Sequence, residues 1–290
     1  MADNQKQTVQ WFPGHMAKTR RLIKENLKLV DGVVEVIDAR IPYSSSNPEL
    51  SELIADKPRI VLLNKCDLAD PYISSKWIEY YKSLGIAALT VDCRSGKGLN
   101  KFPIAVKEVL SEKIQKNIDK GMPGNPLKLM VVGIPNTGKS SFINRMAGAS
   151  KAKVADKAGV TRQNQWFHIG NGIELLDTPG VLWPKFDDPM VGDKLAFIGS
   201  VKDEILDVQI LAVKYLDIMN EFFHDRLAER YKISDFEKMK SWDLLEYIGK
   251  KRGFVIKGGE IDRERTAVML LDEYRAGKMG NISLELPPDS

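Results

Sequence analysis

The segment GIPNTGKS at residues 133–140 constrains the fold of this chain more than any other feature. It matches the pattern G-x-x-x-x-G-K-[ST] and follows KLMVV at 128–132, an apolar run typical of a buried strand. Glycines in such a turn let backbone N–H groups close around phosphate oxygens, and the following helix adds partial positive charge. We expect that helix to begin near Lys139, with Lys139 reaching the β- and γ-phosphates of a nucleotide and Ser140 binding Mg²⁺.

Two more short motifs follow apolar runs. Asp177 opens DTPG, and an aspartate beside a phosphate loop can hold Mg²⁺ through water while the Gly180 N–H contacts the γ-phosphate. NKCD begins at Asn64, and a carboxylate at Asp67 can accept from both the N1–H and the exocyclic amine of guanine. Asn64 can tie the base loop to the phosphate loop, and the stem of Lys65 can cover the face of the base. The motifs predict a guanine nucleotide, with an ordinary Asn-Asp turn as the alternative for NKCD.

Strand and helix patterns divide the chain into two parts. Apolar runs alternate with helical periodicity in the first part, which predicts a parallel α/β sheet, and only helical patterns follow from about residue 190. We predict an α/β domain over 1–188 and a small all-helical domain over 189–290. The expected strands are 32–37, 59–63, 87–91, 128–132 and 173–176; the expected helices are 17–29, 49–54, 75–84, 100–117, 205–231, 235–251 and 262–276, with a Gly/Pro-rich linker at 118–126.

The composition limits the class of protein. The chain has 290 residues, of which 43% are hydrophobic and 28% charged, so disorder is excluded as its main state. Cys66 and Cys93 are too few for a disulfide scaffold or a cysteine zinc site, and we expect them to be small, half-buried filling residues. No apolar run approaches the roughly 18 residues of a membrane span, and no signal peptide pattern is present. We therefore expect a cytoplasmic protein with no membrane partner.

The order of the motifs is unusual. Translation-factor-like P-loop GTPases place N-K-x-D after the phosphate loop, whereas here it comes first, as in the circularly permuted GTPases. The linker at 118–126 would then join the old termini. With WFPGHM at 11–16, DARIP at 38–42, SSNP at 45–48 and DTPGVLWP at 177–184, the chain resembles the bacterial ribosome biogenesis GTPase A family along essentially its whole length. The resemblance implies a cytoplasmic GTPase that acts in late maturation of the large ribosomal subunit and binds its rRNA.

The same resemblance assigns the nucleotide site. It implies GTP or GDP with Mg²⁺ held by Ser140, Thr161 and Asp177, where Thr161 is the switch threonine. The final base-contact loop is usually S-A-K, but the matching stretch here is DCR at 92–94, which leaves the side-chain roles there open. The residues carried over are Gly133, Asn136, Thr137, Gly138, Lys139, Ser140 and Ser141 of the phosphate loop, Asp177 and Gly180 of the second switch, and Asn64, Lys65 and Asp67 of the base site.

The residue that positions the attacking water is not the usual one. Many such GTPases have a glutamine after D-x-x-G, but Val181 stands there and cannot hydrogen-bond water. His15, in an aromatic–Pro–Gly turn before a helix, is the candidate, alongside catalytic roles for Lys139 and Thr161. A structural or RNA-facing His15 is the alternative. Asn136 occupies the position that ligates K⁺ in related GTPases lacking the glutamine, which makes K⁺ a further candidate cofactor; a loop-stabilising asparagine is the alternative.

Basic residues suggest where RNA binds. The chain has a net charge of +4, and residues 1–30 alone hold six basic and two acidic side chains. A solvated helix face is the alternative explanation of these charges. We expect a monomer that binds the large ribosomal subunit and its rRNA, and no DNA. The rival functions are a GTP-sensing RNA-binding module with negligible hydrolysis, a GTPase acting on another RNA, and an ATPase or kinase, which Asp67 disfavours. The candidate RNA contacts are Lys18, Arg20, Arg21, Lys24, Lys250, Lys251, Arg252 and Lys257.

Overall fold

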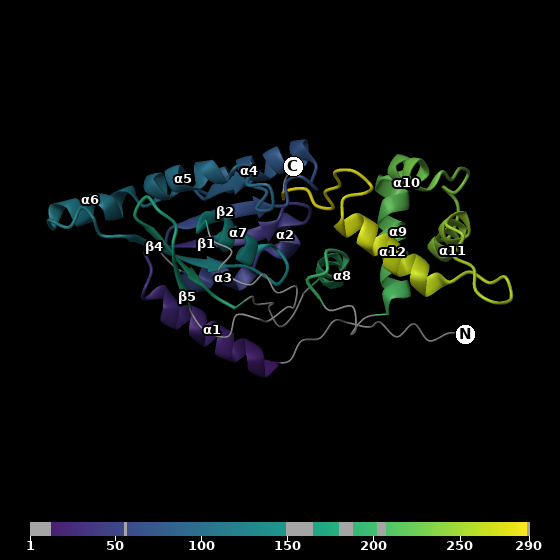
Figure 1. The fold of residues 1–290 in the computed structure, drawn as a ribbon, viewed down its shortest axis with the longest axis horizontal. Helices are drawn as coiled ribbons and strands as arrows, with labels where there is room; N and C mark the ends of the chain where they lie inside the picture. Colours follow the sequence, from purple (N-terminus) through teal and green to yellow (C-terminus); the bar gives the residue numbers. More distant parts are fainter. Residues whose placement is uncertain (1–12, 55–56, 149–164, 180–187, 202–206, 289–290) are drawn as a thin grey trace. The chain divides into compact units, whose positions relative to one another are not determined.

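The computed structural model describes residues 13–54, 57–148, 165–179, 188–201 and 207–288 (Figure 1). Two compact units divide the chain. One comprises Gln10–Phe186 and Ser283–Ser290, and the other Met1–Val9 and Asp187–Ile282. We call them the α/β unit and the helical unit. The two units divide near residue 187, and the last eight residues group with the α/β unit.

A six-stranded sheet forms the centre of the α/β unit. Its order is β3-β2-β1-β4-β6-β5, and all neighbours are parallel except β5 and β6. The strands are β1 (Gly32–Asp38), β2 (Arg59–Asn64), β3 (Ala87–Thr90), β4 (Leu127–Val132), β5 (Gln165–His168) and β6 (Ile173–Asp177). Because parallel strands end at the same edge of a sheet, the carboxyl ends of β2, β1, β4 and β6 lie side by side in that order. The expected mostly parallel sheet is therefore present.

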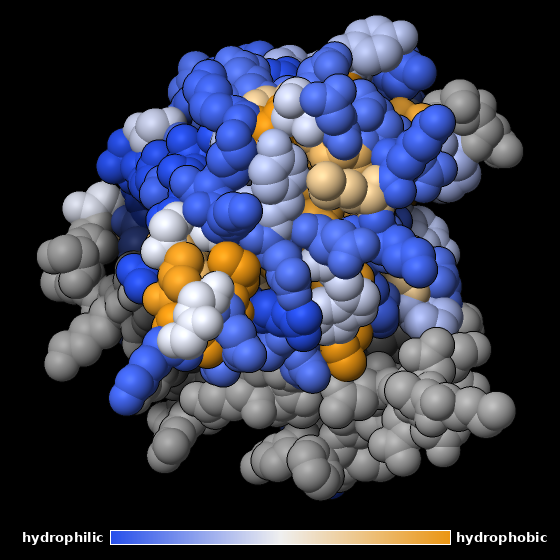
Figure 2. All heavy atoms as spheres, turned by 90° about the vertical axis from the view of Figure 1, so that its right-hand side faces the viewer, coloured by the Kyte–Doolittle hydropathy of each residue, from blue (hydrophilic) through white to orange (hydrophobic). Residues whose placement is uncertain are grey.

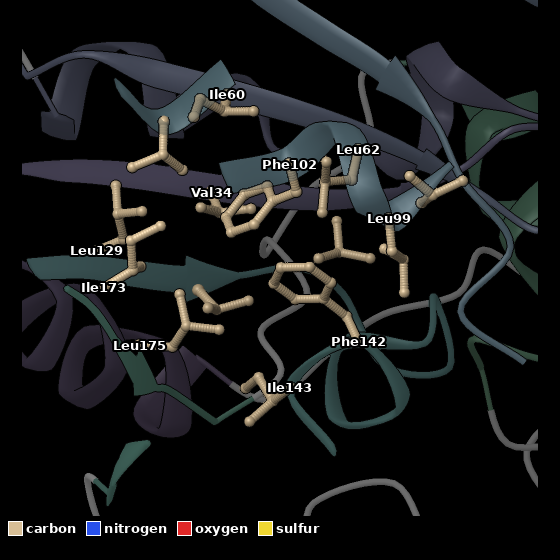
Figure 3. Close-up of a cluster of buried hydrophobic side chains, with 14 of the residues drawn as sticks. Val34, Ile60, Leu62, Leu99, Phe102, Leu129, Phe142, Ile143, Ile173 and Leu175 are labelled. Carbon is tan, nitrogen blue, oxygen red and sulfur yellow. The ribbon is translucent and has the colours of Figure 1, made fainter. Parts of the chain in front are cut away.

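Alternate residues of the buried strands point to opposite sides of the sheet, so both faces carry apolar side chains. Helices cover both of these faces. Val34 and Val36 of β1 pack with Phe102 and Phe142, whose rings meet edge to face at 5.0 Å between centroids (Figure 3). On the other side Val33 packs against α1 and α3, and Ile37, Val61 and Leu63 pack against α4. The helices are α1 (Pro13–Leu27), α2 (Pro42–Ser45), α3 (Pro48–Ile54), α4 (Pro71–Ser83), the short 3-10 helix η1 (Leu99–Lys101), α5 (Phe102–Val109), α6 (Ser111–Asp119) and α7 (Lys139–Met146).

Several elements differ from the sequence expectation. The helix expected at 100–117 is interrupted at Leu110, whose backbone leaves the helical region at φ −102° and ψ 21°. The short helix α2 lies where no helix was expected from the sequence, and Pro42 begins it because the fixed φ of proline suits the first helical position. The antiparallel edge strand β5 was not expected, since its four residues give too short a pattern.

The helical unit consists of α8 (Pro189–Phe197), α9 (Val208–Phe222), α10 (His224–Tyr231), α11 (Ser241–Lys251) and α12 (Arg263–Arg275). Side chains of Asp188, Asp207 and Asp262 accept hydrogen bonds from the free N–H groups that begin α8, α9 and α12. Tyr215 lies at the centre of the core, with the rings of Phe197 and Tyr274 at 5.4 and 4.9 Å. Hydrophilic side chains predominate on the face of this unit in Figure 2, around separate apolar patches. None of the described helices is long and apolar enough to cross a bilayer.

Candidate functional site

The candidate site lies at the carboxyl edge of the sheet. Three of the strands that end there carry the sequence motifs: β2 leads into NKCD, β4 into the phosphate loop and β6 into DTPG. β1 ends at Asp38 between β2 and β4, and Asp38 pairs in register with Asn64. The fold therefore brings motifs that are distant in sequence to neighbouring strand ends.

The phosphate loop connects β4 to α7, as expected, and α7 begins at Lys139. Two of its positions require glycine, because neighbouring atoms leave no room for a Cβ. A Cβ at Gly133 would lie 2.6 Å from the carbonyl oxygen of Val36, and one at Gly138 would lie 2.2 Å from Nδ2 of Asn64. Gly138 also has a φ of +95°, which side chains rarely permit. Any larger residue at either position would displace the backbone that is expected to hold phosphate.

Lys139 and Asp177 form a buried pair beside this loop. The ammonium of Lys139 donates to the carboxylate of Asp177 and to the carbonyl oxygen of Thr178. The hydroxyl of Thr178 in turn donates to the carbonyl oxygen of Val131 at 2.7 Å, which holds the end of β6 against β4. Burial lowers the pKa of Lys139, and the nearby carboxylate partly opposes this shift. A phosphate oxygen can replace Asp177 as the partner of Lys139, which leaves the carboxylate available to a metal ion.

The oxygen groups present here fit a magnesium ion. Ser140 is partly exposed in the first turn of α7, and Asp177 supplies a carboxylate at the neighbouring strand end. Hydroxyl and carboxylate oxygens are the hard ligands that Mg²⁺ prefers, and Mg²⁺ often uses few protein ligands together with substrate phosphates. No cluster of three or more His, Cys, Asp or Glu side chains suited to a metal occurs within the described ranges.

Asn64 joins three loops on the base side of the site. Its Nδ2 donates to the carbonyl oxygen of Thr137 at 2.6 Å, and its Oδ1 accepts from the N–H of Cys93 at 3.0 Å. The first bond is the tie between the base loop and the phosphate loop that the sequence suggested. The second reaches the loop after β3, where the DCR stretch begins.

Asp92 shapes the loop that replaces the usual S-A-K sequence. Its carboxylate accepts from the N–H groups of Arg94 and Ser95 at 2.8 and 3.2 Å. Arg145 of α7 donates to the carbonyl oxygen of Ser95 and so links this loop to the helix after the phosphate loop. The carboxylate of Asp67 stays partly exposed, with Nη2 of Arg94 at 3.9 Å. The side chain of Asp92 thus shapes the loop, and Asp67 presents a partly exposed carboxylate beside it.

A buried charge cluster at the end of β1 was missed by sequence reasoning. Asp38 accepts hydrogen bonds from Nε and Nη2 of Arg40 at 2.9 and 2.8 Å, and Nζ of Lys65 lies 3.1 Å from its carboxylate. Burial disfavours the charged form of Asp38, but the two cations outweigh it and hold the pKa of this carboxyl well below its usual value. The motif DARIP was visible in the sequence, and an aspartate at a strand end beside the base loop was the available signal.

Other predicted residues occupy different places. Thr161, Gly180 and Val181 lie outside the described residues. His15 is in the first turn of α1, and its side chain, like that of Lys18, is outside the described set as well. Asn136 is exposed in the phosphate loop with a φ of +64°, and Ser141 is half-buried in α7.

The candidate RNA residues divide between the two units. In the α/β unit Arg20 of α1 pairs with Glu49 of α3, and Arg21 pairs with Glu25 within α1. In the helical unit the side chain of Arg252 turns inward, where its Nη2 lies 3.4 Å from the carboxylate of Glu273. The exposed basic side chains around the end of α11 are Lys250, Lys251 and Lys257.

Known proteins resemble this chain along nearly its whole length. A family model described as "50S ribosome-binding GTPase" matches residues 128–245. The chain is 46% identical over 284 residues to ribosome biogenesis GTPase A of Priestia megaterium, covering 98% of each chain. The chain belongs to the ribosome biogenesis GTPase A family. Its namesake in Thermotoga maritima is 34% identical over 279 residues, covering 96% of this chain and 95% of the relative.

Solved structures of the same family agree with the fold. GDP-bound YlqF matches with a TM-score of 0.66 and 32% identity, covering 93% of this chain and all of that one. GNP-bound YlqF from Thermotoga maritima matches with a TM-score of 0.64 and 31% identity, covering 94% and 100%. The family members are GTP-hydrolysing enzymes, so this chain is a GTPase with guanine nucleotides as its ligands. The circularly permuted order is confirmed: the base motif after β2 precedes the phosphate loop after β4.

Proposed function

We propose that this GTPase is an assembly factor in late maturation of the large ribosomal subunit and that it binds the rRNA of that subunit. The observation that carries the proposal is the near full-length identity to relatives named ribosome biogenesis GTPase A. The description "50S ribosome-binding GTPase" over residues 128–245 also supports it, because that range includes the phosphate loop and part of the helical unit. We expect the protein to act as a cytoplasmic monomer.

The proposed reaction is hydrolysis of the bond between the β- and γ-phosphates of GTP. A water oxygen attacks the γ-phosphorus, the bond to the bridging oxygen breaks, and GDP and phosphate leave. Mg²⁺ held by Ser140, Thr161 and Asp177 would neutralise charge on the phosphate oxygens. The ammonium of Lys139 would bind the same oxygens, and the Gly180 N–H would contact the γ-phosphate. The phosphate cradle would consist of Gly133, Asn136, Thr137, Gly138, Lys139, Ser140 and Ser141, and Asn64, Lys65 and Asp67 would read the guanine base.

His15 is the proposed residue for orienting the attacking water. The usual glutamine is replaced by Val181, so another polar group must hold the water in line. Asn136 is proposed to ligate a K⁺ ion, which would add positive charge beside the phosphates. If Asn136 does so, Asn136→Ala will abolish any difference in turnover between K⁺ and Na⁺ buffers.

The test of the enzymatic proposal is GTP turnover in K⁺ buffer with and without purified large ribosomal subunits. We expect slow basal turnover, stimulation by about tenfold or more, and loss of the stimulated rate in His15→Ala. His168→Ala is the matched control, since His168 has a 79% exposed side chain at the end of β5. No stimulation would favour a GTP-sensing binder or another RNA target. Stimulation that survives in His15→Ala would overturn the assignment of His15.

The rRNA contacts require a separate test by charge removal. We expect combined substitution of Lys250, Lys251 and Lys257 by alanine to weaken binding to large subunits. The slope of log affinity against log salt concentration should also become shallower by about three. The matched control replaces Lys232, Lys238 and Lys240, which are exposed lysines of the same unit. Equal effects of the two triple variants would indicate non-specific charge attraction and contradict this surface assignment.

A further inference from the structure

Asp38 and Arg40 of the buried cluster at the end of β1 lie outside the nucleotide motifs, yet the strand that carries Asp38 lies between two of them. β1 is flanked by β2, which carries the base loop, and by β4, which carries the phosphate loop. Asp38 is fully buried, and its register partner on β2 is Asn64, the residue before Lys65. An ionised carboxylate in such a place needs charged or hydrogen-bonding partners, because an unpaired buried charge is strongly destabilising.

Asp38 has two cationic partners with different surroundings. Arg40 is 1% exposed and forms a forked hydrogen-bonded pair with both carboxylate oxygens. Lys65 keeps 25% of its side chain exposed while its ammonium lies 3.1 Å from Asp38. The stem of Lys65 therefore runs from the base loop toward a fixed anchor, and part of it remains accessible. The backbone of Lys65 has a φ of +58°, so the loop itself adopts a conformation that favours glycine.

The anchor is itself held from a distant part of the chain. The N–H of Leu284 donates to the carbonyl oxygen of Arg40 at 2.8 Å, and the buried carboxylate of Glu285 accepts from the N–H of Ser44 at 3.0 Å. Trp77 of α4 donates to the carbonyl oxygen of Glu285 at 3.1 Å. We call residues 283–287 the C-terminal strap; it reaches the α/β unit beside α4 (Figure 1). The strap fixes the turn after β1 that carries Arg40, so the cluster has little freedom to move.

We propose that Asp38 is a positioning residue of the base site, which holds the Lys65 side chain extended so that its stem covers the face of guanine. The inference rests on the proposed assignment of Lys65 to the base site. Its physical basis is that an anchored stem loses less conformational freedom on binding than a mobile one, because the long side chain of lysine has much rotamer entropy to lose. Asp38 would then raise the affinity for the base without touching it.

A double-mutant cycle on nucleotide affinity tests the proposal. Asp38→Asn and Lys65→Met are each expected to weaken binding of a fluorescent GDP about tenfold. The double variant is expected to bind GDP no more weakly than the weaker-binding single variant, because both changes remove the same ion pair that anchors the stem. Losses that multiply in the double variant, or an unchanged affinity in folded Asp38→Asn, would overturn the proposal. Lys65→Arg, which keeps a cation able to pair with Asp38, should recover most of the affinity.

Two further arms separate positioning from structural damage. Affinities for GDP and IDP should fall by the same factor in Asp38→Asn, since the stem contacts the ring face and not the 2-amino group; a selective loss for GDP would contradict the proposal. Asp38→Asn leaves Arg40 buried without its carboxylate and can therefore fail to fold. In that case the double variant Asp38→Asn with Arg40→Gln replaces both charges by amides. We expect the same tenfold loss of GDP affinity in this double variant. An unchanged affinity in that variant would overturn the proposal.

A separate variant tests the assignment of the base site independently of the role proposed for Asp38. Asp67→Asn should shift preference from GDP toward XDP, because an amide can donate to the carbonyl that xanthine has in place of the guanine amine. If that shift is absent, the base-site assignment is wrong. If it is present while Asp38→Asn binds GDP normally, only the role of Asp38 is wrong.

Discussion

The base side and the phosphate side of the nucleotide site are built differently. On the base side, Asn64, Asp38 and Asp92 bond to the backbone or to cations of neighbouring loops, so their geometry is set by the fold. On the phosphate side, Lys139 and Asp177 pair with each other. In the proposed mechanism each would change partner when phosphate and Mg²⁺ are bound. The comparison indicates a base side that is already organised for binding and a phosphate side that rearranges. Substitutions on the two sides should therefore affect different quantities.

The largest effect is expected from the phosphate side. Lys139→Met removes the ammonium proposed to face the phosphates, and we expect GTP turnover to fall by about 100-fold or more. Phosphate release measures this loss. Lys113→Met is the matched control, because Lys113 pairs with Asp31 at 2.9 Å elsewhere in the same unit. A loss of less than about threefold in Lys139→Met would show that the phosphate side is not the centre of the chemistry.

A smaller effect, mainly on affinity, is expected from Asn64→Ala on the base side. The change removes the bonds to Thr137 and Cys93, and we expect GDP to bind about tenfold more weakly. It should also lower the free energy of unfolding by about 1–3 kcal/mol, since the buried partners lose their hydrogen bonds. Asn100→Ala, at an exposed position of η1, is the control for both titration calorimetry and thermal unfolding. The comparison fails if turnover by the saturated enzyme falls as far as it does in Lys139→Met.

The C-terminal strap should affect stability more than chemistry. Glu285→Ala leaves the N–H and hydroxyl of Ser44 without their carboxylate, and we expect the free energy of unfolding to fall by about 1–3 kcal/mol. Leu286→Ala is the neighbouring control, because Leu286 is 55% exposed. Urea denaturation of the two variants measures the difference. Equal stabilities would show that the strap does not brace the α/β unit.

A buried carboxylate of the helical unit provides a contrast to Asp38. Burial opposes ionisation of Glu273, but hydrogen bonds from Arg230 and Tyr231 and the charge of Arg252 lower its pKa below the usual value of 4.5. Its stabilising contribution is therefore present above pH 4.5 and is lost as the pH falls through the lowered pKa. We expect Glu273→Gln to be about 1 kcal/mol less stable at pH 7, with the difference shrinking below pH 4.5, and to bind GDP normally. A weaker GDP affinity would contradict its purely structural role.

The smallest effect concerns the two thiols beside the base loops. Burial raises the pKa of Cys93 to about 12, and it raises the pKa of the half-buried Cys66 as well. Both thiols are therefore protonated at pH 7, and a thiol-reactive dye should label Cys66 slowly and Cys93 more slowly still. Mass spectrometry of labelled peptides measures the two rates. Rapid labelling of Cys93 would show that the base side opens readily, against the organised geometry described above.

The sequence could predict the elements that depend on local pattern. The apolar runs before 64–67, 133–140 and 177–180 placed the motifs at strand ends, and the strand order then brought those ends together. It could not predict contacts made between distant residues. Ser44 and Glu285 are 241 residues apart, and nothing near either residue signals the other. The pairing of Asp38 with Lys65 was missed for the same reason, because the two residues are distant in sequence and Lys65 was interpreted only through the base motif.

The comparison of the two sides is tested most directly by hydrogen exchange with and without GDP and Mg²⁺. Peptides covering 64–67 and 92–97 should already be protected without nucleotide and should change little when it binds. Peptides covering 133–141 and 177–179 should gain most of the added protection, because Lys139 and Asp177 change partners there. Added protection that is as large at 92–97 as at 133–141 would contradict a base side organised by the fold.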